Sequence, residues 1–267
     1  MRRPRFAWRF VAPVLSCLAI AAPSQADVKL PKVFGSHMVL QRDQKDPVFG
    51  WADPGEEITV KIHGQTKKAT AGADGSWRVV LDPLPAGGPH TMTVSGKNSI
   101  TFDDVLVGEV WICSGQSNMQ WDLRQANDPD IESMTAKFPR LRLISVPQVG
   151  TQEPQKDFNG KWDVCTPQTA ATFSAVGYFF GRILHQALDV PVGLIDDAWG
   201  GSACEAWVRR DLLEKDGKYA DLLAKWKDTE DKYASADSEA KQKMEGQMRG
   251  NSRPANIYNG VLKPTIG

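Results

Sequence analysis

A serine stands directly after a strand-like apolar run near the middle of the chain. Residues 105–113 are rich in Val, Leu, Ile and Trp, as a buried strand should be, and Gly115 ends the run just before Gln116, Ser117 and Asn118. Ligands of open α/β sheets bind at the carboxyl ends of strands, so the position of Ser117 suits a nucleophile. The same residues also suit a strand followed by a helix N-cap, and the local pattern leaves both interpretations open.

A glycine-rich turn follows a second apolar run about 80 residues later in the chain. Residues 191–196 form that run, and Trp199, Gly200, Gly201 and Ser202 come after it. Glycines let a backbone approach a ligand closely, and their N–H groups can point at a developing anion. A tight turn between a strand and a helix would use the same residues, so the motif alone does not separate chemistry from structure.

The first part of the chain, residues 27–104, is expected to be an antiparallel β-sandwich domain. Short β-prone runs recur about every ten residues and are separated by turn signals, which is the spacing of a sandwich. The alternation at Ile58, Val60 and Ile62 places these three side chains towards a core. Trp51 and Trp77 suit either a core or a carbohydrate-binding face. The β-prone runs are residues 47–51, 57–62, 76–81, 90–94 and 99–102.

After Phe102 the pattern changes to buried strands alternating with helical segments, which indicates an α/β domain over residues 105–267. Strands are expected at 105–113 and 140–146, and Ser174 is expected to cap a helix at 175–188. Residues of about 208–250 are highly charged and predict a helical excursion with a broad solvated face. The apolar residues of the 175–188 helix recur at helical spacing and are expected to face a sheet: Val176, Phe179, Phe180, Ile183, Leu184 and Ala187.

The N-terminus has the pattern of a secretory signal peptide over residues 1–26. A basic start leads into an apolar run at 10–22, and the small residues Ser24 and Ala26 suit cleavage after Ala26. Twin-arginine and lipoprotein signals, at Arg2-Arg3 and Cys17, are minor alternatives. The sequence therefore predicts export, to the periplasm or the extracellular space. Cleavage removes four of the 32 basic residues and none of the 32 acidic ones. The resulting charge of −4 argues against partners such as nucleic acid or an anionic membrane.

The mature chain would keep three cysteines, Cys113, Cys165 and Cys204. An odd number cannot pair completely within one chain, so a disulfide framework is not expected, although one pair remains possible. The spacing matches no zinc pattern, and packing is the favoured interpretation of all three thiols. We expect no metal ion and no organic cofactor.

Three motifs in the same order resemble the sialate O-acetylesterase family of SGNH hydrolases. They are residues 115–119 after the first strand, residues 199–202 after the second, and Tyr258-Asn259-Gly260, with further likeness at 107–111 and 205–207. The likeness covers nearly all of the mature chain. It implies an SGNH-type, flavodoxin-like three-layer domain preceded by the β-sandwich domain.

The resemblance also implies roles for individual residues. Ser117 would be the nucleophile that attacks an acetyl ester on a sugar and forms an acyl-enzyme, which water then hydrolyses. The oxyanion hole would use the Ser117 N–H and one from the glycine turn, with Gly200 favoured and Gly201 left open. One such donor is worth about 3 kcal/mol. The residues implied around the substrate are Gln116, Asn118, Met119, Trp199 and Glu205.

The sequence departs from the family pattern at the catalytic base. The family supplies a histidine in an Asp-x-x-His segment and a third oxyanion donor in a Gln-Gly-Glu segment, and neither is present. His37, His63, His90 and His185 are instead expected in turns or on the surface. We therefore expect the chain to be the N-terminal part of a longer enzyme, with an incomplete catalytic domain and negligible esterase activity.

Two alternatives remain open at this point. The chain could be a non-catalytic carbohydrate-binding or interaction protein in which the β-sandwich does the binding. It could also be an esterase of the acetyl xylan type, because the serine and glycine motifs do not identify the sugar.

Overall fold

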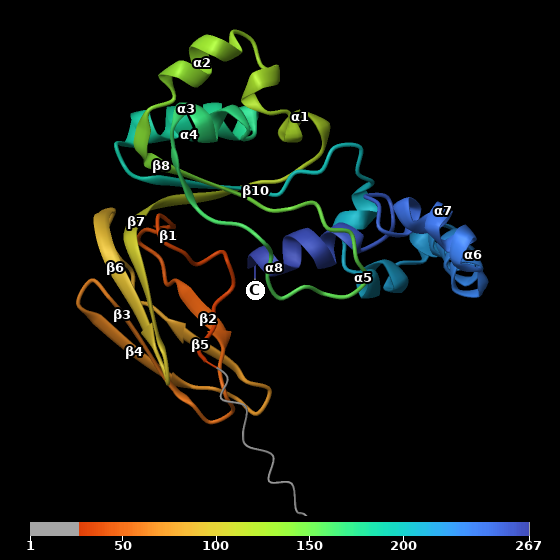
Figure 1. Cartoon of the computed structure of the whole chain (residues 1–267), viewed down its shortest axis with the longest axis horizontal. Helices are drawn as coiled ribbons and strands as arrows, with labels where there is room; N and C mark the ends of the chain where they lie inside the picture. The colour runs from red at the N-terminus through yellow and green to blue at the C-terminus, as the bar shows by residue number, and fades with distance from the viewer. Residues whose placement is uncertain (1–26, 267) are drawn as a thin grey trace, which may run out of the picture.

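The computed structural model has a mixed α/β fold built on one large sheet (Figure 1). The structure describes residues 27–266, so the predicted signal peptide lies outside the described residues. The sheet has the order β4-β3-β6-β7-β10-β8-β9, with β1 paired on β7, and β2 and β5 form a separate ladder. The strands are β1 (Val39–Gln41), β2 (Pro47–Trp51), β3 (Glu57–Ile62), β4 (Gln65–Thr70), β5 (Ser76–Val80), β6 (Gly87–Ser95), β7 (Ser99–Cys113), β8 (Phe138–Ser145), β9 (Asp163–Cys165) and β10 (Val192–Asp196).

The helices of residues 27–266 all follow the long strand β7 in the chain and differ widely in length. Across residues 27–266, every helix is too short or too polar to cross a lipid bilayer. The α-helices are α1 (Ser117–Gln120), α2 (Pro129–Thr135), α3 (Pro167–Ala171), α4 (Ala175–Leu188), α5 (Arg210–Lys215), α6 (Ala220–Ser235), α7 (Ser238–Met248) and α8 (Lys263–Ile266). Shorter turns of helix are η1 (Leu123–Gln125), η2 (Cys204–Trp207), η3 (Gly217–Tyr219) and the π-helix η4 (Tyr258–Leu262).

Strand β7 joins the antiparallel and the parallel parts of the sheet. It pairs antiparallel with β6 at its start and parallel with β10 at its end. The expected break between strands at 99–102 and 105–113 is therefore wrong. Asp104 adopts φ 56°, which bends the strand, but its carboxylate accepts hydrogen bonds from Arg142 and His37. These contacts hold the bend while the pairing continues on either side.

The antiparallel part contributes to an apolar core that continues under the parallel part, where Ile144 of β8 and Ile195 of β10 belong to the same cluster. The predicted alternation in β3 is confirmed, because Ile58, Val60 and Ile62 are at most 2% exposed. The ladder of β2 and β5 packs over this face and contributes Val48 and Trp77 to the same core. The buried alternate residues of these strands pack the two antiparallel layers against each other.

Helix α4 has the predicted boundaries but packs through a different face. Ser174 caps it by accepting a hydrogen bond from the Gly177 N–H at 3.1 Å. The buried residues include Gly177, Tyr178 and Gly181, and a Cβ added at Gly181 would lie 2.6 Å from Leu194 of β10. The two glycines, one helical turn apart, allow the helix to approach the sheet.

The predicted apolar face of α4 is consequently wrong in part. Phe179 and Leu184 are half-buried, but Val176, Phe180 and Ile183 are more than 40% exposed. The spacing of large apolar residues identifies an apolar stripe along the helix. It does not reveal that the face with Gly177 and Gly181 makes the closer contact with the sheet.

One edge of the parallel sheet is open in residues 27–266. Residues 109–113 of β7 pair with β10, and no described strand pairs with their other side. Trp111 and Ile112 are 45% and 43% exposed there, and the Trp111 ring contacts Phe180 of α4 with centroids 5.1 Å apart. Apolar side chains thus continue from the strand edge onto the exposed face of the helix.

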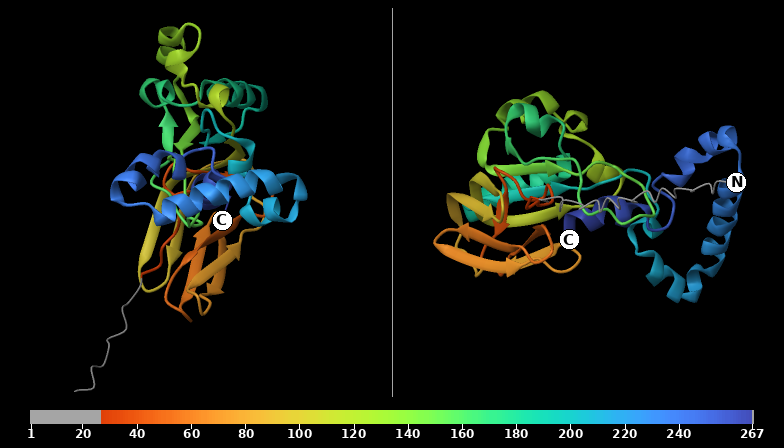
Figure 2. Two further views of the ribbon diagram at one scale, coloured as in Figure 1. Left: turned by 90° about the vertical axis from the view of Figure 1, so that its right-hand side faces the viewer. Right: turned by 60° about the horizontal axis from the view of Figure 1, so that its bottom comes forward.

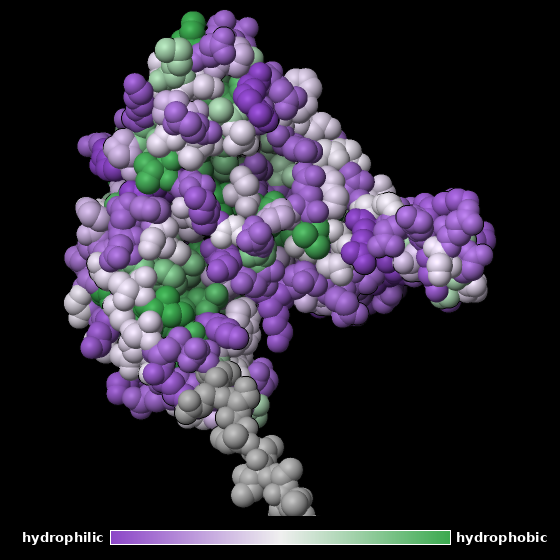
Figure 3. All heavy atoms as spheres, viewed as in Figure 1, coloured by the Kyte–Doolittle hydropathy of each residue, from purple (hydrophilic) through white to green (hydrophobic). Residues whose placement is uncertain are grey.

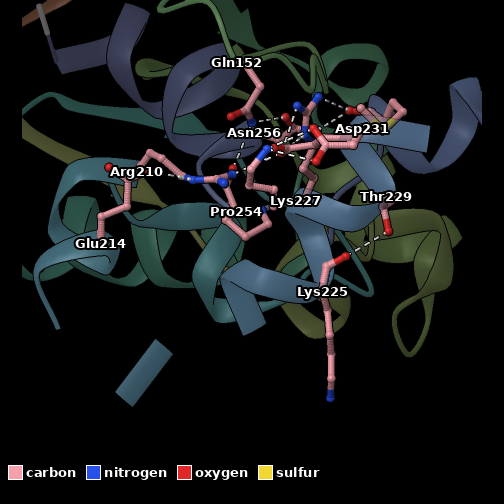
Figure 4. Close-up of polar contacts among 12 residues, drawn as sticks. Gln152, Arg210, Glu214, Lys225, Lys227, Thr229, Asp231, Pro254 and Asn256 are labelled. Atoms are coloured by element: carbon pink, nitrogen blue, oxygen red, sulfur yellow. Dashed lines mark hydrogen bonds and ion pairs between the residues drawn. The ribbon is translucent and has the colours of Figure 1, made fainter. Parts of the chain in front are cut away.

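Helices α5 to α7 occupy the charged segment and project away from the sheet (Figure 2). Arg210 of α5 and Arg253 both contact Glu230 of α6, at 3.2 and 3.0 Å. Arg210 is among the polar side chains drawn in Figure 4. This ion-pair cluster fixes α6 against the segment that leads back to the sheet.

The three described cysteines are free thiols. Cys113 and Cys165 are buried, and burial raises the pKa of each to about 12. Cys204 is exposed, so the packing interpretation is wrong for this residue. It lies in η2, immediately after the glycine turn, where the backbone follows the surface.

Candidate active site

The carboxyl ends of β7 and β10 bring the two motifs together. The strands are parallel and in register, with Ile195 opposite Ile112 and Asp196 opposite Cys113. Both following loops therefore leave the same edge of the sheet. The Trp199 N–H donates to the Gly115 carbonyl at 2.9 Å, which ties one loop to the other.

Ser117 is the first residue of α1, and its side chain is exposed. Gly115 takes φ 148°, which glycine adopts readily, and so turns the chain from the strand into this short helix. The Ser117 Oγ donates to Gln116 Oε1 at 3.0 Å. As the first helical residue, Ser117 has a backbone N–H with no partner inside the helix.

Gly200 lies directly beside the serine. A Cβ added to Gly200 would be 3.5 Å from the Ser117 Cα. The Gly200 N–H donates to Gln120 Oε1, and the Gly200 carbonyl accepts from Asn251 Nδ2 at 2.7 Å. Gly201 adopts φ 69°, which explains the second glycine. The favoured oxyanion donor thus already has an intramolecular acceptor.

Gln120 and Asn251 were not among the residues expected at the site. Gln120 comes three positions after Ser117, so a short helix places both on one face, and that spacing was an available signal. Asn251 is about 50 residues from the glycines in sequence and lies in the segment after α7. No local pattern points to it.

The remaining residues expected around the substrate lie in different surroundings. Asn118 is exposed, and Glu205 is half-buried in η2. Met119 packs against the core, and its Sδ accepts from Ser174 Oγ at 3.4 Å. Trp199 is half-buried and also packs against a core cluster. Asn118 and Gln116 are therefore the exposed members of the set closest in sequence to Ser117.

The third motif, Tyr258-Asn259-Gly260, has a structural place in η4. Asn259 is buried, and its Nδ2 donates to the Gln152 carbonyl at 2.9 Å. The Gln152 side chain in turn donates to Asn256 Oδ1 at 2.7 Å, a contact drawn in Figure 4. A Cβ at Gly260 would clash with the Val149 carbonyl at 1.8 Å. These residues fasten the 148–155 loop.

Two adjacent carboxylates stand at the carboxyl end of β10, where Asp196 is the last residue of the strand and Asp197 follows it. Asp197 is 1% exposed, and neither of its oxygens has a hydrogen-bond partner of ordinary geometry. Burial raises the pKa of Asp197 to about 7, the Ser114 hydroxyl partly offsets this, and the charge of Asp196 adds to it. Burial also raises the pKa of Asp196 to about 6, against the Ala198 N–H that bonds it. In the sequence, the signal for this feature is the pair of acids that directly follows the apolar run at 191–195.

None of the four histidines contacts Ser117 in the described residues. His37 bonds Asp104 at 2.7 Å, and the rings of His63 and His90 lie 4.6 Å apart beside the antiparallel strands. His185 Nδ1 contacts the Val190 carbonyl at 2.7 Å near the far end of α4. The serine therefore has an amide side chain, and no imidazole, as its hydrogen-bond partner.

Comparison with known proteins identifies the family. The family model described as "Carbohydrate esterase, sialic acid-specific acetylesterase" matches residues 107–242, which include both loops of the site. The chain belongs to this family. The sialate O-acetylesterase of Rattus norvegicus is 36% identical over 203 residues, covering 68% of this chain and 38% of its own length. The human sialate O-acetylesterase is 37% identical over 191 residues, covering 64% and 36%.

A solved structure of a carbohydrate acetylesterase from Xanthomonas citri has the same fold over most of the chain. The TM-score is 0.73 at 34% identity, and the match covers 89% of this chain and 48% of that one. The chain thus spans less than half the length of these relatives. Membership of the sialic acid-specific acetylesterase family applies to the residues present, and the activity of the whole relatives is a separate question.

Proposed function

We propose that this chain carries the nucleophile and part of the oxyanion hole of a carbohydrate O-acetylesterase. The observation that supports this most strongly is the meeting of the exposed Ser117 with the Gly200 turn, at the shared edge of two parallel strands. A nucleophile and backbone donors within a few ångströms are what acyl transfer requires.

In the proposed reaction, Ser117 Oγ attacks the acetyl carbonyl carbon and loses its proton to a base, the bond between that carbon and the sugar oxygen breaks, and the sugar oxygen takes up a proton and leaves as a hydroxyl. The Ser117 and Gly200 N–H groups would stabilise the negative charge on the carbonyl oxygen. Gln120 Oε1 must first release the Gly200 N–H, because one N–H cannot serve both acceptors well. Water then attacks the acetyl-serine and releases acetate.

Within the described residues, no basic group is placed to accept the proton of Ser117 Oγ. Its acceptor is the Gln116 amide oxygen, which can accept a hydrogen bond but is too weakly basic to take the proton. The histidines lie elsewhere, and a serine enzyme without its base loses several orders of magnitude in rate. We therefore propose that the chain alone has negligible esterase activity.

The proposed substrate is a small molecule or glycan that carries O-acetyl groups, on sialic acid or a related sugar. An acetylated plant polysaccharide of the xylan type remains an alternative, because no described residue selects the sugar. Export to the periplasm or the extracellular space, with no membrane attachment after cleavage and no nucleic-acid partner, is part of the proposal.

Chemical rescue tests the proposal directly. Imidazole in solution can act as the missing base at an exposed serine. The chain and its Ser117→Ala variant are compared for p-nitrophenyl acetate hydrolysis over a range of imidazole concentrations, so that hydrolysis by imidazole itself is subtracted. We expect a Ser117-dependent rate that grows with imidazole. Equal rates for both proteins at every concentration would favour the non-catalytic, carbohydrate-binding alternative.

A further inference from the structure

A cavity of about 590 Å³ lies between the β2–β5 ladder and the segment 154–156, with Lys263 of α8 at its wall. Its size falls within the range of small-molecule sites. None of its lining residues belongs to the Ser117 loop or the Gly200 turn. The cavity is therefore separate from the candidate active site.

The pairing of β2 with β5 explains why aromatic side chains face this cavity. Val48 of β2 and Val79 of β5 point into the core, so their neighbours along each strand point to the opposite face of the ladder. Phe49 stands opposite Arg78, and Trp51 opposite Ser76, on that outer face. Phe49 and Trp51 are half-buried, and apolar residues gather over β2 on the face shown in Figure 3.

Trp77 also contributes to the lining, but its side chain alternates with Ser76 and Arg78 and lies on the core side of β5. The side chains of the outer face, Phe49, Trp51 and Arg78, therefore define what this cavity can bind.

The charged residues of the lining are mainly cationic. Arg78, Lys156 and Lys263 form no ion pair with a carboxylate of residues 27–266. Asp74 is the acidic residue of the lining, and hydrogen bonds from Ser76, with a smaller contribution from the charge of Lys156, hold the pKa of its carboxyl below the usual range. Asp74 is therefore ionised, and the three cations of the lining exceed this one carboxylate by two positive charges.

We propose that this cavity binds an acidic sugar residue of a glycan, with its carboxylate at Arg78 and Lys156 and its apolar C–H face on Trp51 and Phe49. Aromatic faces supply contact area for a sugar ring, and a guanidinium bonds a carboxylate in a charge-assisted, bidentate way. The choice of a sugar over other anions rests on the proposed function. The binding itself requires no hydrolysis.

The test is saturation-transfer NMR and a titration of the full chain with N-acetylneuraminic acid. N-acetylmannosamine, which lacks the carboxylate, and AMP, an anion with an aromatic ring, are titrated in parallel. We expect N-acetylneuraminic acid to bind and N-acetylmannosamine to bind about tenfold more weakly or not at all.

Variants locate the binding. Arg78→Gln, an exposed change, and Trp51→Ala should each weaken N-acetylneuraminic acid binding about tenfold. Lys232→Gln, on the remote helix α6, is the matched charge control and should have no effect. Ser117→Ala should also leave N-acetylneuraminic acid binding at this cavity unchanged. Binding here can therefore succeed or fail independently of the proposed esterase reaction at Ser117. Absence of binding, equal binding of N-acetylmannosamine, a preference for AMP, or normal binding in Arg78→Gln would each overturn the proposal.

Discussion

Individual side chains around Ser117 explain why its hydroxyl is accessible to a substrate and why it is not activated as a nucleophile. Ser117 is exposed and adjacent to Gly200, but its hydroxyl bonds an amide oxygen. Asp197 is buried with no hydrogen-bond partner of ordinary geometry, and its raised pKa marks its ionised form as costly at neutral pH. The site therefore contains one exposed nucleophile and, nearby in the chain, one buried carboxyl group whose charge is poorly compensated.

Replacement of Asp197 by Asn should change how stability depends on pH. The folded pKa of about 7 exceeds the ordinary value of 3.8, so between about pH 4 and 7 the folded chain holds a proton that the unfolded chain has lost. Stability conferred by that proton falls as pH rises through this window. We expect Asp197→Asn to be more stabilising at pH 8 than at pH 5 by about 2 kcal/mol. Urea unfolding at both pH values measures it, and identical pH dependence in both proteins would contradict the assignment.

Among the elements, α4 shows what local sequence can and cannot predict. Its limits follow from Ser174 and the helical periodicity, and β3 follows from simple alternation, so both were predictable. The buried face of α4 depends on Leu141 and Leu194, which belong to strands on either side of it in sequence. Contacts of that kind are set by the packing of distant elements, and periodicity does not contain them.

A pair of glycine substitutions tests the packing of α4. Gly181→Ala adds a methyl group against Leu194 and Leu141 and should lower the free energy of unfolding by about 2 kcal/mol. Gly246→Ala, in the last turn of α7 with no atom within 4 Å of the new Cβ, is the control. It should raise the free energy of unfolding by up to about 1 kcal/mol through helix propensity. Similar effects of the two changes, measured by urea unfolding, would show that α4 does not pack closely on the sheet.

For the whole molecule, a continuous strand, a shared apolar core and a buried ion pair connect the antiparallel part to the parallel part. β7 runs through both, and Arg142 of β8, which is 4% exposed, bonds Asp104 at the bend. Contacts between segments that are distant in sequence also limit how far the candidate site could be predicted. Ser117 and the two glycines could be found from their motifs, but Gln120 at the Gly200 N–H and Asn251 at the Gly200 carbonyl depend on how the loops fold back.

The junction can be tested at Asp104. Asp104→Asn keeps a residue that tolerates positive φ but leaves the buried Arg142 guanidinium without its negative partner. We expect a loss of about 2 kcal/mol in the free energy of unfolding. Asp189→Asn is the matched control, because Asp189 also has positive φ and pairs with Arg140, but at the surface. That change should have little effect, and an equally large loss there would contradict the importance of burial.

The central claim is that these residues hold the esterase nucleophile without the base that would activate it. The most direct measurement is acetate release from O-acetylated N-acetylneuraminic acid by the chain and by Ser117→Ala, with no added base. The predicted result is that the two proteins release acetate at the same negligible rate. Robust release that disappears in Ser117→Ala would contradict the account, because it would require a base among the residues described above.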